Sequence, residues 1–288
     1  MSNKDLLDSI KKLREMTGVG FKDCKIALDE TKGDIEKSIE FLRKKGIAKA
    51  SKKMSRTASE GLALVHEENG EVSIIEINSE TDFVAKNQDF INFCKELSKI
   101  NFVSKSDLNK INETKMENGI LVKDNLVNLI AKIGEKITIR RANFFDKSNG
   151  TNFFYVHSAL EKRVGKIISV VKIEGVHNGK NDDIGNKLAM HIAASNPLAV
   201  DKENINKSIV EKELEIIKAE ITNSGKPVEM VEKISNGKIS KFLNDNSLLN
   251  QIWIMDPKKK VSDILKENSS DKPLKIIDFI RYKVGEGV

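Results

Sequence analysis

The sequence has few of the residues that build disulfide-bonded or metal-bound frameworks. Its 288 residues include only two cysteines, Cys24 and Cys94. This number excludes a disulfide framework and a zinc site made of several thiolates. Both cysteines stand at helix-periodic apolar positions, which indicates small buried hydrophobic residues. Only four prolines occur and no segment is of low complexity, so a disordered scaffold is excluded as well.

Aromatic residues and long apolar runs are also scarce. Aromatics make up 5% of the chain, with one Trp and two Tyr, which argues against stacking platforms for single-stranded nucleic acid. No apolar run approaches the roughly 20 residues that a membrane-spanning helix needs. The first residues already carry charges and form no apolar core, so we expect no secretory signal, no membrane partner and a cytoplasmic location.

The usual enzyme signatures are missing from the sequence. A P-loop ends in Gly-Lys followed by Ser or Thr, but all four Gly-Lys pairs precede Ile, Asn or Pro. The dinucleotide-binding, nucleophile-elbow, zinc-protease and Cys-x-x-Cys motifs do not occur either. None of the four histidines has a second metal ligand at helical spacing. We therefore expect no enzyme activity, no catalytic residues, no cofactor and no metal site.

Residues 1–50 have the periodicity of three short helices separated by glycine-containing breaks. Asp34 is the expected N-cap of the third helix, and Gly46 is its expected end. A unit of this size is typical of a small binding module. The basic stretch from Lys44 to Arg56 is interpreted as a solvated helical linker, with a phosphate-binding patch as the alternative.

From Leu62 onward the apolar pattern becomes alternating. Residues 62–65 and 72–77 flank Asn69-Gly70, which predicts a β-hairpin. We expect further strands at 136–145, 152–157, 164–174 and 277–284, and helices around 90–97, 126–133 and 183–195. Because the order hairpin, loop, helix occurs twice, the sequence predicts an α+β core with antiparallel sheets and two related subdomains.

The pattern also predicts a helical hairpin and a set of domain borders. Residues 204–244 carry two helical stripes around a turn at 223–227, which predicts a projecting helical hairpin. The predicted domains are residues 1–55 with three helices and a linker, a first core subdomain at 56–148 and a second at 149–288. The hairpin is inserted into this second subdomain.

The segment Glu80–Asn87, with the sequence ETDFVAKN, has two interpretations. In the first, Thr81 or Asp82 caps a helix and Phe83 packs inward. In the second, Phe83 is an exposed wedge beside an acidic group, the kind of anchor that enters a partner's pocket. Elementary physical chemistry favours the first interpretation.

This segment resembles the signature of the translation elongation factor Ts family, the nucleotide exchange factors of elongation factor Tu. Other blocks resemble the family's motifs in the same order along essentially the whole chain: Leu13–Leu28, Gly33–Gly46, Met190–Pro197, Ser224–Pro227, Asp256–Val261 and Val284–Gly287. The resemblance implies that the three helices form a domain like the ubiquitin-associated domain, followed by a two-subdomain core and a helical hairpin.

The resemblance also implies a partner and a mechanism. The partner would be elongation factor Tu in its GDP-bound and nucleotide-free states. Exchange of GDP for GTP would follow from a disturbance of Mg²⁺ and phosphate binding, without covalent chemistry in this chain. The family positions nearest the Mg²⁺ are occupied by Thr81, Asp82, Phe83 and Val84. Further partner-binding positions are occupied by Arg14, Phe21, Lys22, Ile133, Gly134 and His157.

Three alternatives stay open on the sequence alone. Phe21 could pack in the helical core instead of binding the partner. The hairpin could mediate a homodimer or a 2:2 complex. A different function, that of a basic RNA- or ribosome-associated protein, is suggested by the net charge of +6, the pI near 9.0 and the Lys49–Arg56 stretch. RNA binding would weaken steeply with salt, whereas we expect no direct nucleic-acid contact of an exchange factor.

Overall fold

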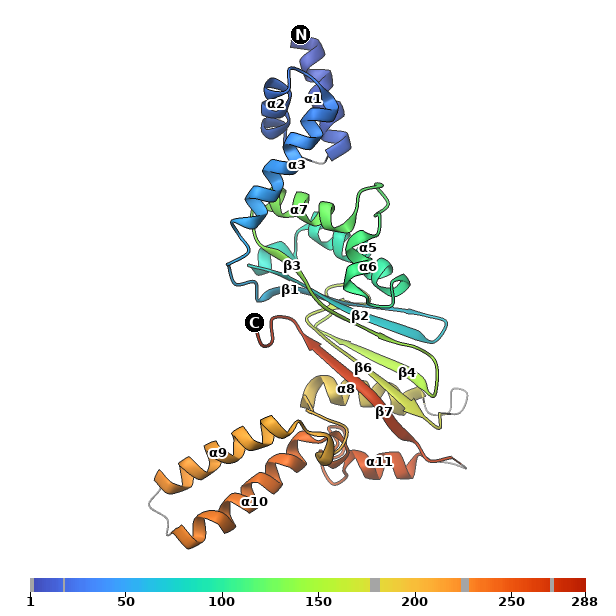
Figure 1. Ribbon diagram of the computed structural model, residues 1–288. Helices are drawn as coiled ribbons and strands as arrows, with labels where there is room; N and C mark the ends of the chain where they lie inside the picture. Colours follow the sequence, from blue (N-terminus) through green and yellow to red (C-terminus); the bar gives the residue numbers. More distant parts are fainter. Residues whose placement is uncertain (1–2, 18, 177–181, 224–227, 270–271) are drawn as a thin grey trace. The chain divides into compact units, whose positions relative to one another are not determined.

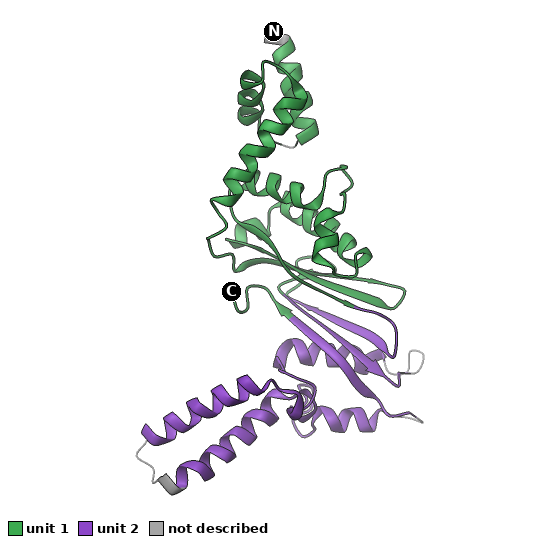
Figure 2. Cartoon of the chain, viewed as in Figure 1, with its two compact units in different colours: residues 1–144, 158–166, 282–288 green, residues 145–157, 167–281 purple. Residues whose placement is uncertain are grey.

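The computed structural model describes residues 3–17, 19–176, 182–223, 228–269 and 272–288 (Figure 1). These residues form two compact units (Figure 2). Unit 1 comprises residues 1–144, 158–166 and 282–288, and unit 2 comprises residues 145–157 and 167–281. The predicted α+β class with antiparallel sheets and an N-terminal helical region is confirmed. The predicted domain borders stay predictions.

Unit 1 begins with the three predicted helices, which are α1 (Asn3–Thr17), α2 (Phe21–Glu30) and α3 (Ile35–Ser51). Asp34 caps α3 as expected, because its side chain accepts a hydrogen bond from the backbone N–H of Lys37 at 3.0 Å. The helices enclose a small apolar core made of Ile10, Leu13, Cys24, Ala27, Leu28 and Leu42. Gly18, part of the predicted break after the first helix, lies outside the described residues.

The prediction that the third helix ends at Gly46 is wrong, since α3 continues to Ser51. Gly46 lies where α3 packs against α7 (Val122–Ile133). A Cβ atom at this position would be 3.3 Å from Cγ1 of Val127 and 3.9 Å from Cβ of Ala131. The missing side chain therefore allows two helices to approach closely, and it does not end the helix.

The basic stretch after the bundle is only partly a solvated helix. Lys45 and Lys49 both bind the carboxylate of Asp23, at 3.1 and 3.2 Å. After Ser51 the chain leaves the helix, and Arg56 binds Glu80 at 3.2 Å. Several charges of this stretch are thus matched by carboxylates within the protein.

The first sheet has the strand order β3-β2-β1-β5. Its strands are β1 (Glu60–Glu68), β2 (Glu71–Ser79), β3 (Ile137–Phe145) and β5 (Val164–Gly165). The predicted hairpin is confirmed: β1 pairs with β2 along its whole length. Asn69 and Gly70 between them have positive φ angles of 53° and 81°, as the tight hairpin turn requires.

Helices pack on this sheet and complete the core of unit 1 (Figure 1). They are α4 (Asp82–Ala85), α5 (Gln88–Val103), α6 (Leu108–Glu113) and α7. Phe90, Cys94 and Leu97 on α5 are fully buried with apolar residues of β1 and β2. The helix start expected at Thr81 or Asp82 is a separate short helix, α4, which is divided from α5. Helix α6 is not among the predicted elements, because one or two turns give too little periodicity to detect.

Unit 2 contains the second sheet, with the strand order β4-β6-β7. Its strands are β4 (Thr151–His157), β6 (Ile167–Glu174) and most of β7 (Lys275–Lys283). Helix α8 (Asp182–Ser195) packs on β4 and β6, and α11 (Val261–Glu267) adds apolar residues to the same core. The single tryptophan, Trp253, is buried in this core.

The predicted strand at 164–174 is wrong as one element, since it consists of two strands. Val164 and Gly165 pair with Leu64 and Ala63 in the first sheet. After Lys166 the chain enters the second sheet, where β6 pairs with β4. One nearly continuous apolar run therefore serves two different cores.

The helical hairpin is confirmed as α9 (Lys207–Asn223) and α10 (Val228–Asn246), which pack against each other. Ile217 and Ile221 on α9 are buried. Most of the predicted turn, residues 224–227, lies outside the described residues. The homodimer that the hairpin could mediate stays a prediction.

Candidate partner-binding site

The short helix α4 exposes Phe83. The side chain of Phe83 is 78% exposed, whereas its neighbours Val84 and Ala85 are buried in the core of unit 1. The single turn of α4 is thus anchored on one side and leaves a large aromatic ring in solvent on the other. The interpretation that Phe83 packs inward is wrong.

Asp82 places a negative charge next to this exposed ring. Its carboxylate lies 2.8 Å from Nζ of Lys86, one turn further along the chain. The hydrogen bond from Lys86 lowers the pKa of Asp82 below its ordinary value, so the group is ionised at neutral pH. The exposed part of the site therefore combines an apolar ring with a carboxylate.

Thr81 occupies the N-cap position of α4, but its hydroxyl does not cap the helix. Instead, Oγ1 of Thr81 donates to Oε1 of Glu135 at 2.9 Å, and the backbone N–H of Thr81 donates to Oε2 at 3.0 Å. Both oxygens of one carboxylate thus hold one residue. Residues 54 positions apart in the chain are joined by this contact.

Glu80 makes the reciprocal contact. Its carboxylate accepts a hydrogen bond from the backbone N–H of Lys136 at 2.5 Å and from the guanidinium of Arg56 at 3.2 Å. Burial by itself would raise the pKa of Glu80, but the hydrogen bonds from Lys136 and Arg56 outweigh it and lower the pKa. Glu80 is therefore held as a carboxylate between two segments.

The structure brings six of the ten predicted residues together. Ile133 and Gly134 end α7 immediately before Glu135, so the contacts just described place them beside Thr81, Asp82, Phe83 and Val84. Gly134 is the C-cap of α7 with a φ of 88°, which a residue with a side chain rarely adopts. Its carbonyl oxygen accepts a hydrogen bond from Lys53.

Three predicted residues lie on the helical bundle. Arg14 on α1 and Lys22 on α2 are exposed, and Phe21, the first residue of α2, is 46% exposed. Cys24 and Leu28 on the same helix are buried in the core of the bundle, but Phe21 is not part of it. The core-packing alternative for Phe21 is therefore wrong.

His157 is the one predicted residue in unit 2. It is the exposed last residue of β4, and its Nδ1 lies 3.3 Å from the hydroxyl of Tyr155. The other nine residues belong to unit 1.

Sequence reasoning did not identify Glu80 and Glu135 as residues that shape the site. Their partners are backbone groups, a threonine and an arginine on distant segments, so no spacing along the chain marks them. The only available sign was indirect: Glu135 directly follows a helix-ending glycine, in the turn that leads into a strand.

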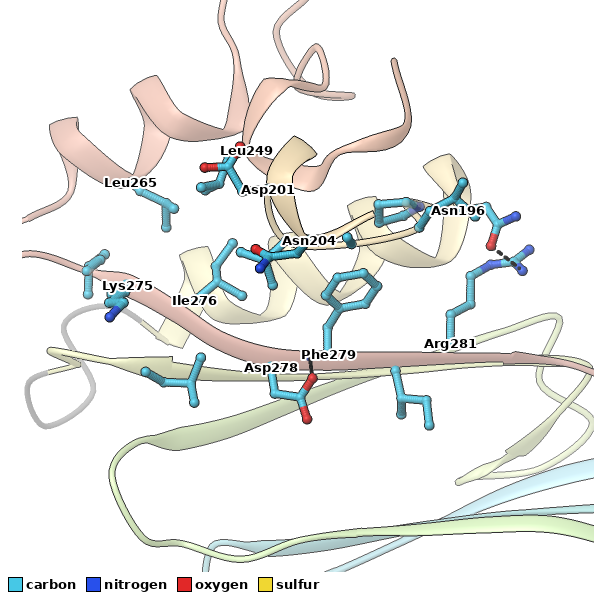
Figure 3. A pocket seen from close by; sticks show the side chains of 17 residues that line it. Asn196, Asp201, Asn204, Leu249, Leu265, Lys275, Ile276, Asp278, Phe279 and Arg281 are labelled. Carbon is cyan, nitrogen blue, oxygen red and sulfur yellow. Dashed lines mark hydrogen bonds between the residues drawn. The ribbon is translucent and has the colours of Figure 1, made fainter. Parts of the chain in front are cut away.

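A cavity of about 740 Å³ lies in unit 2, along one side of β7 (Figure 3). Phe279 points into it, and Arg281 is directed to Asn196, whose side-chain oxygen it binds at 3.0 Å. The carboxylate of Asp278 accepts from the backbone N–H of Phe279. None of the ten predicted residues lines this cavity.

The described residues also contain no group of three or more His, Cys, Asp or Glu side chains placed to bind a metal ion. No helix in the same residues is long and apolar enough to cross a membrane. The site therefore offers a binding surface, which consists of the exposed ring of Phe83 and the carboxylate of Asp82. The backbone before them is held by hydrogen bonds from Thr81 to Glu135.

Comparisons with known proteins agree with the order of motifs along the chain. A family model described as "Elongation factor TS" matches residues 80–286. The proteins named "Elongation factor Ts" of Zymomonas mobilis and of Methylobacterium sp. (strain 4-46) are 38% and 40% identical over 283 residues, which cover 97% of this chain and 92% of each relative. The protein of the same name from Rickettsia prowazekii is 38% identical over 285 residues, or 97% of this chain and 91% of the relative.

Proposed function

The chain belongs to the elongation factor Ts family and is therefore a translation elongation factor, and from this premise we propose that it promotes the exchange of GDP for GTP on elongation factor Tu. The observation that carries the proposal is the exposed Phe83 beside the ionised Asp82, on a helical turn whose other side is buried in the core of unit 1. A ring in this position can enter a pocket of the partner while the carboxylate approaches charged groups next to it.

An exchange factor must bind one state of its partner better than another. It shifts the nucleotide equilibrium only by the ratio of its affinities for the nucleotide-free and the GDP-bound partner. By the same reciprocity, GDP weakens the binding of the factor by that ratio. We propose that Phe83 supplies this difference, because its ring is buried only where the partner's elements separate around Mg²⁺ and phosphate.

The remaining predicted residues would extend the contact. Ile133 and Gly134 adjoin the same surface, and Arg14, Phe21 and Lys22 would bind the partner from the helical bundle. We propose His157 as a contact from unit 2. The RNA-binding alternative loses part of its support, because Lys45, Lys49 and Arg56 are paired with carboxylates of the chain itself.

The test is the release of a fluorescent GDP analogue from elongation factor Tu, measured against the concentration of this chain. We expect the chain to accelerate release and the Phe83→Ala variant to lose most of this effect. Truncation of a central aromatic anchor costs about 2 kcal/mol or more, which corresponds to a factor of roughly 30. Asp82→Ala should give a smaller loss, because its charge is exposed and partly screened by Lys86.

A matched control is Val103→Ala at the end of α5, where the side chain is 81% exposed but lies outside the predicted site. This variant should act like the unchanged chain. Equal acceleration by the unchanged chain and Phe83→Ala would show that the site is wrong while the function stands. No acceleration by the unchanged chain would overturn the proposed function and redirect attention to salt-dependent RNA binding.

A further inference from the structure

A one-turn helix has little stability of its own, so something else must hold Phe83 in place. Helix α4 has four residues, fewer than are needed to repay the cost of helix nucleation. The threonine hydroxyl that would normally satisfy its first N–H groups binds Glu135 instead. Asp82 and Lys86, the other polar groups of the turn, bind each other in solvent.

Two carboxylates hold the segment from the opposite side. Glu135 binds both the N–H and the hydroxyl of Thr81, and Glu80 binds the N–H of Lys136. Each segment thus donates its backbone to a carboxylate of the other. Hydrogen bonds to a charged acceptor are stronger than neutral ones, and two of them on one residue fix its orientation as well as its position.

The linker after the bundle joins the same arrangement. Nζ of Lys136 donates to the carbonyl oxygens of Met54 and Arg56, at 2.8 Å each. The guanidinium of Arg56 in turn binds Glu80. Three segments that are distant in the sequence therefore converge directly before Asp82 and Phe83.

We propose that Glu135 is a positioning residue, which acts through Thr81 to fix the direction in which α4 presents Phe83 to the partner. This inference rests on the proposed exchange function. The hydrogen bonds given for Glu135 in the described structure go to the N–H and hydroxyl of Thr81 and not to Phe83. A misplacement of a reacting or binding group by about 1 Å can cost up to a hundredfold in rate.

Substitutions at Glu135 separate its charge from its geometry. Glu135→Ala removes both contacts, and we expect the maximal rate of GDP release to fall about tenfold. Glu135→Gln can keep both, because the amide oxygen accepts from the Thr81 N–H while the amide nitrogen donates to the Thr81 hydroxyl. This conservative variant should restore most of the maximal rate. The matched control is Glu113→Ala, which removes an exposed carboxylate at the end of α6 that pairs with Lys123 on α7. This variant should leave the maximal rate of GDP release unchanged.

The maximal rate distinguishes positioning from a loss of folded protein. If Glu135→Ala merely unfolds a fraction of the chain, more protein is needed for half-maximal release, but the plateau rate stays the same. If Glu135 positions Phe83, the plateau itself falls. Thr81→Val should lower the plateau less in the Glu135→Ala background than in the otherwise unchanged chain, because the hydrogen bond between the Thr81 hydroxyl and Glu135 is already absent there. An equal effect of Thr81→Val in both backgrounds would overturn the assignment of Thr81 as the intermediary.

A second measurement does not depend on the partner. Hydrogen–deuterium exchange of the free protein should be faster for residues 80–83 in Glu135→Ala than in the unchanged chain, with the strands of unit 1 unaffected. Equal exchange in this segment would overturn the positioning role even if the chain accelerates GDP release. Conversely, a chain that does not accelerate GDP release would contradict the proposed function. The hydrogen–deuterium exchange of residues 80–83 would still decide whether Glu135 holds α4.

Discussion

At the scale of single residues, the most unusual group is Glu76, a fully buried carboxylate among isoleucines of β2. It accepts hydrogen bonds from the guanidinium groups of Arg140 and Arg141, at 2.9 and 2.6 Å, and from the backbone N–H of Gly285 at 2.9 Å. The amide of Asn78 adds a fourth donor at 3.0 Å. Burial alone would raise the pKa of Glu76, but these donors outweigh it and lower the pKa.

We expect Glu76 to make the stability of unit 1 depend on pH. Because its pKa is lower in the folded chain than its ordinary 4.5, Glu76 stabilises the fold above that value. This contribution is lost as the pH falls through the folded-state pKa. In urea titrations followed by circular dichroism, the unchanged chain should lose stability on acidification more steeply than Glu76→Gln. A parallel decline of both would contradict the prediction.

The same substitution site tests the arginine pair at neutral pH. Glu76→Ala leaves Arg140 and Arg141 without their shared partner, which should cost about 3–5 kcal/mol of unfolding free energy. Exposed Glu113 gives the reference, since removal of a surface ion pair costs about 0–1 kcal/mol.

At the scale of elements, two glycines inside helices have opposite roles. Gly46 on α3 lies against Val127 of α7, whereas Gly237 on α10 has no atom within 4 Å of the place where a Cβ would stand. Both lower the intrinsic helix propensity by about 1 kcal/mol relative to alanine. Only Gly46 gains something in return, namely the close approach of another helix.

We therefore expect substitutions at the two glycines to have opposite signs. Gly237→Ala should stabilise unit 2 by up to about 1 kcal/mol, because it adds helix propensity without a clash. Gly46→Leu should destabilise unit 1 by about 1–3 kcal/mol, because the new side chain must displace α7. Chemical denaturation can read the first change by the fluorescence of buried Trp253 and the second by circular dichroism. A stabilising Gly46→Leu would refute the packing argument.

Periodicity predicted most elements, and its errors have specific causes. The hairpin β1–β2, the helices α5 and α7 and the hairpin α9–α10 follow from apolar spacing and turn residues, which are local properties. The end of α3 and the break at Lys166 depend on what the chain meets in space: α7 at Gly46, and a second sheet after Gly165. In the site, the motif around Phe83 was recognisable, but Glu135 was not, because its partner is a backbone group 54 positions away.

At the scale of the whole molecule, the segment 282–288 completes unit 1, although it follows the residues of unit 2 in the sequence. Tyr282 packs under the guanidinium of Arg141, 4.2 Å from its ring centre, and burial raises the pKa of Tyr282 to about 12. Gly285 has a φ of 78°, and a Cβ atom there would be only 1.9 Å from the carbonyl oxygen of Ser59. The close contact of two backbones thus requires glycine.

We expect Gly285→Ala to destabilise unit 1 by several kcal/mol, because the clash with Ser59 adds to the cost of a positive φ, which is about 1–2 kcal/mol. Gly287→Ala carries only the second cost, since its nearest neighbour would be a side-chain nitrogen of Arg140 at 3.7 Å. Circular dichroism should show an earlier transition for Gly285→Ala than for Gly287→Ala. The Trp253 transition of unit 2 should stay unchanged in both, and an equal shift of the two signals would show that the units unfold together.

Because segments of the two units alternate along the sequence, unit 1 is completed only after unit 2 has been synthesised. Residues 1–144 emerge from the ribosome first, then all of unit 2 is made together with residues 158–166 of unit 1, and the segment 282–288 follows after it. Glu76, Arg140 and Arg141 are therefore synthesised long before Gly285, whose backbone N–H is a further donor to Glu76. The growing protein must carry an incomplete first unit through the translation of more than a hundred further residues, and chaperones have that interval in which to bind it.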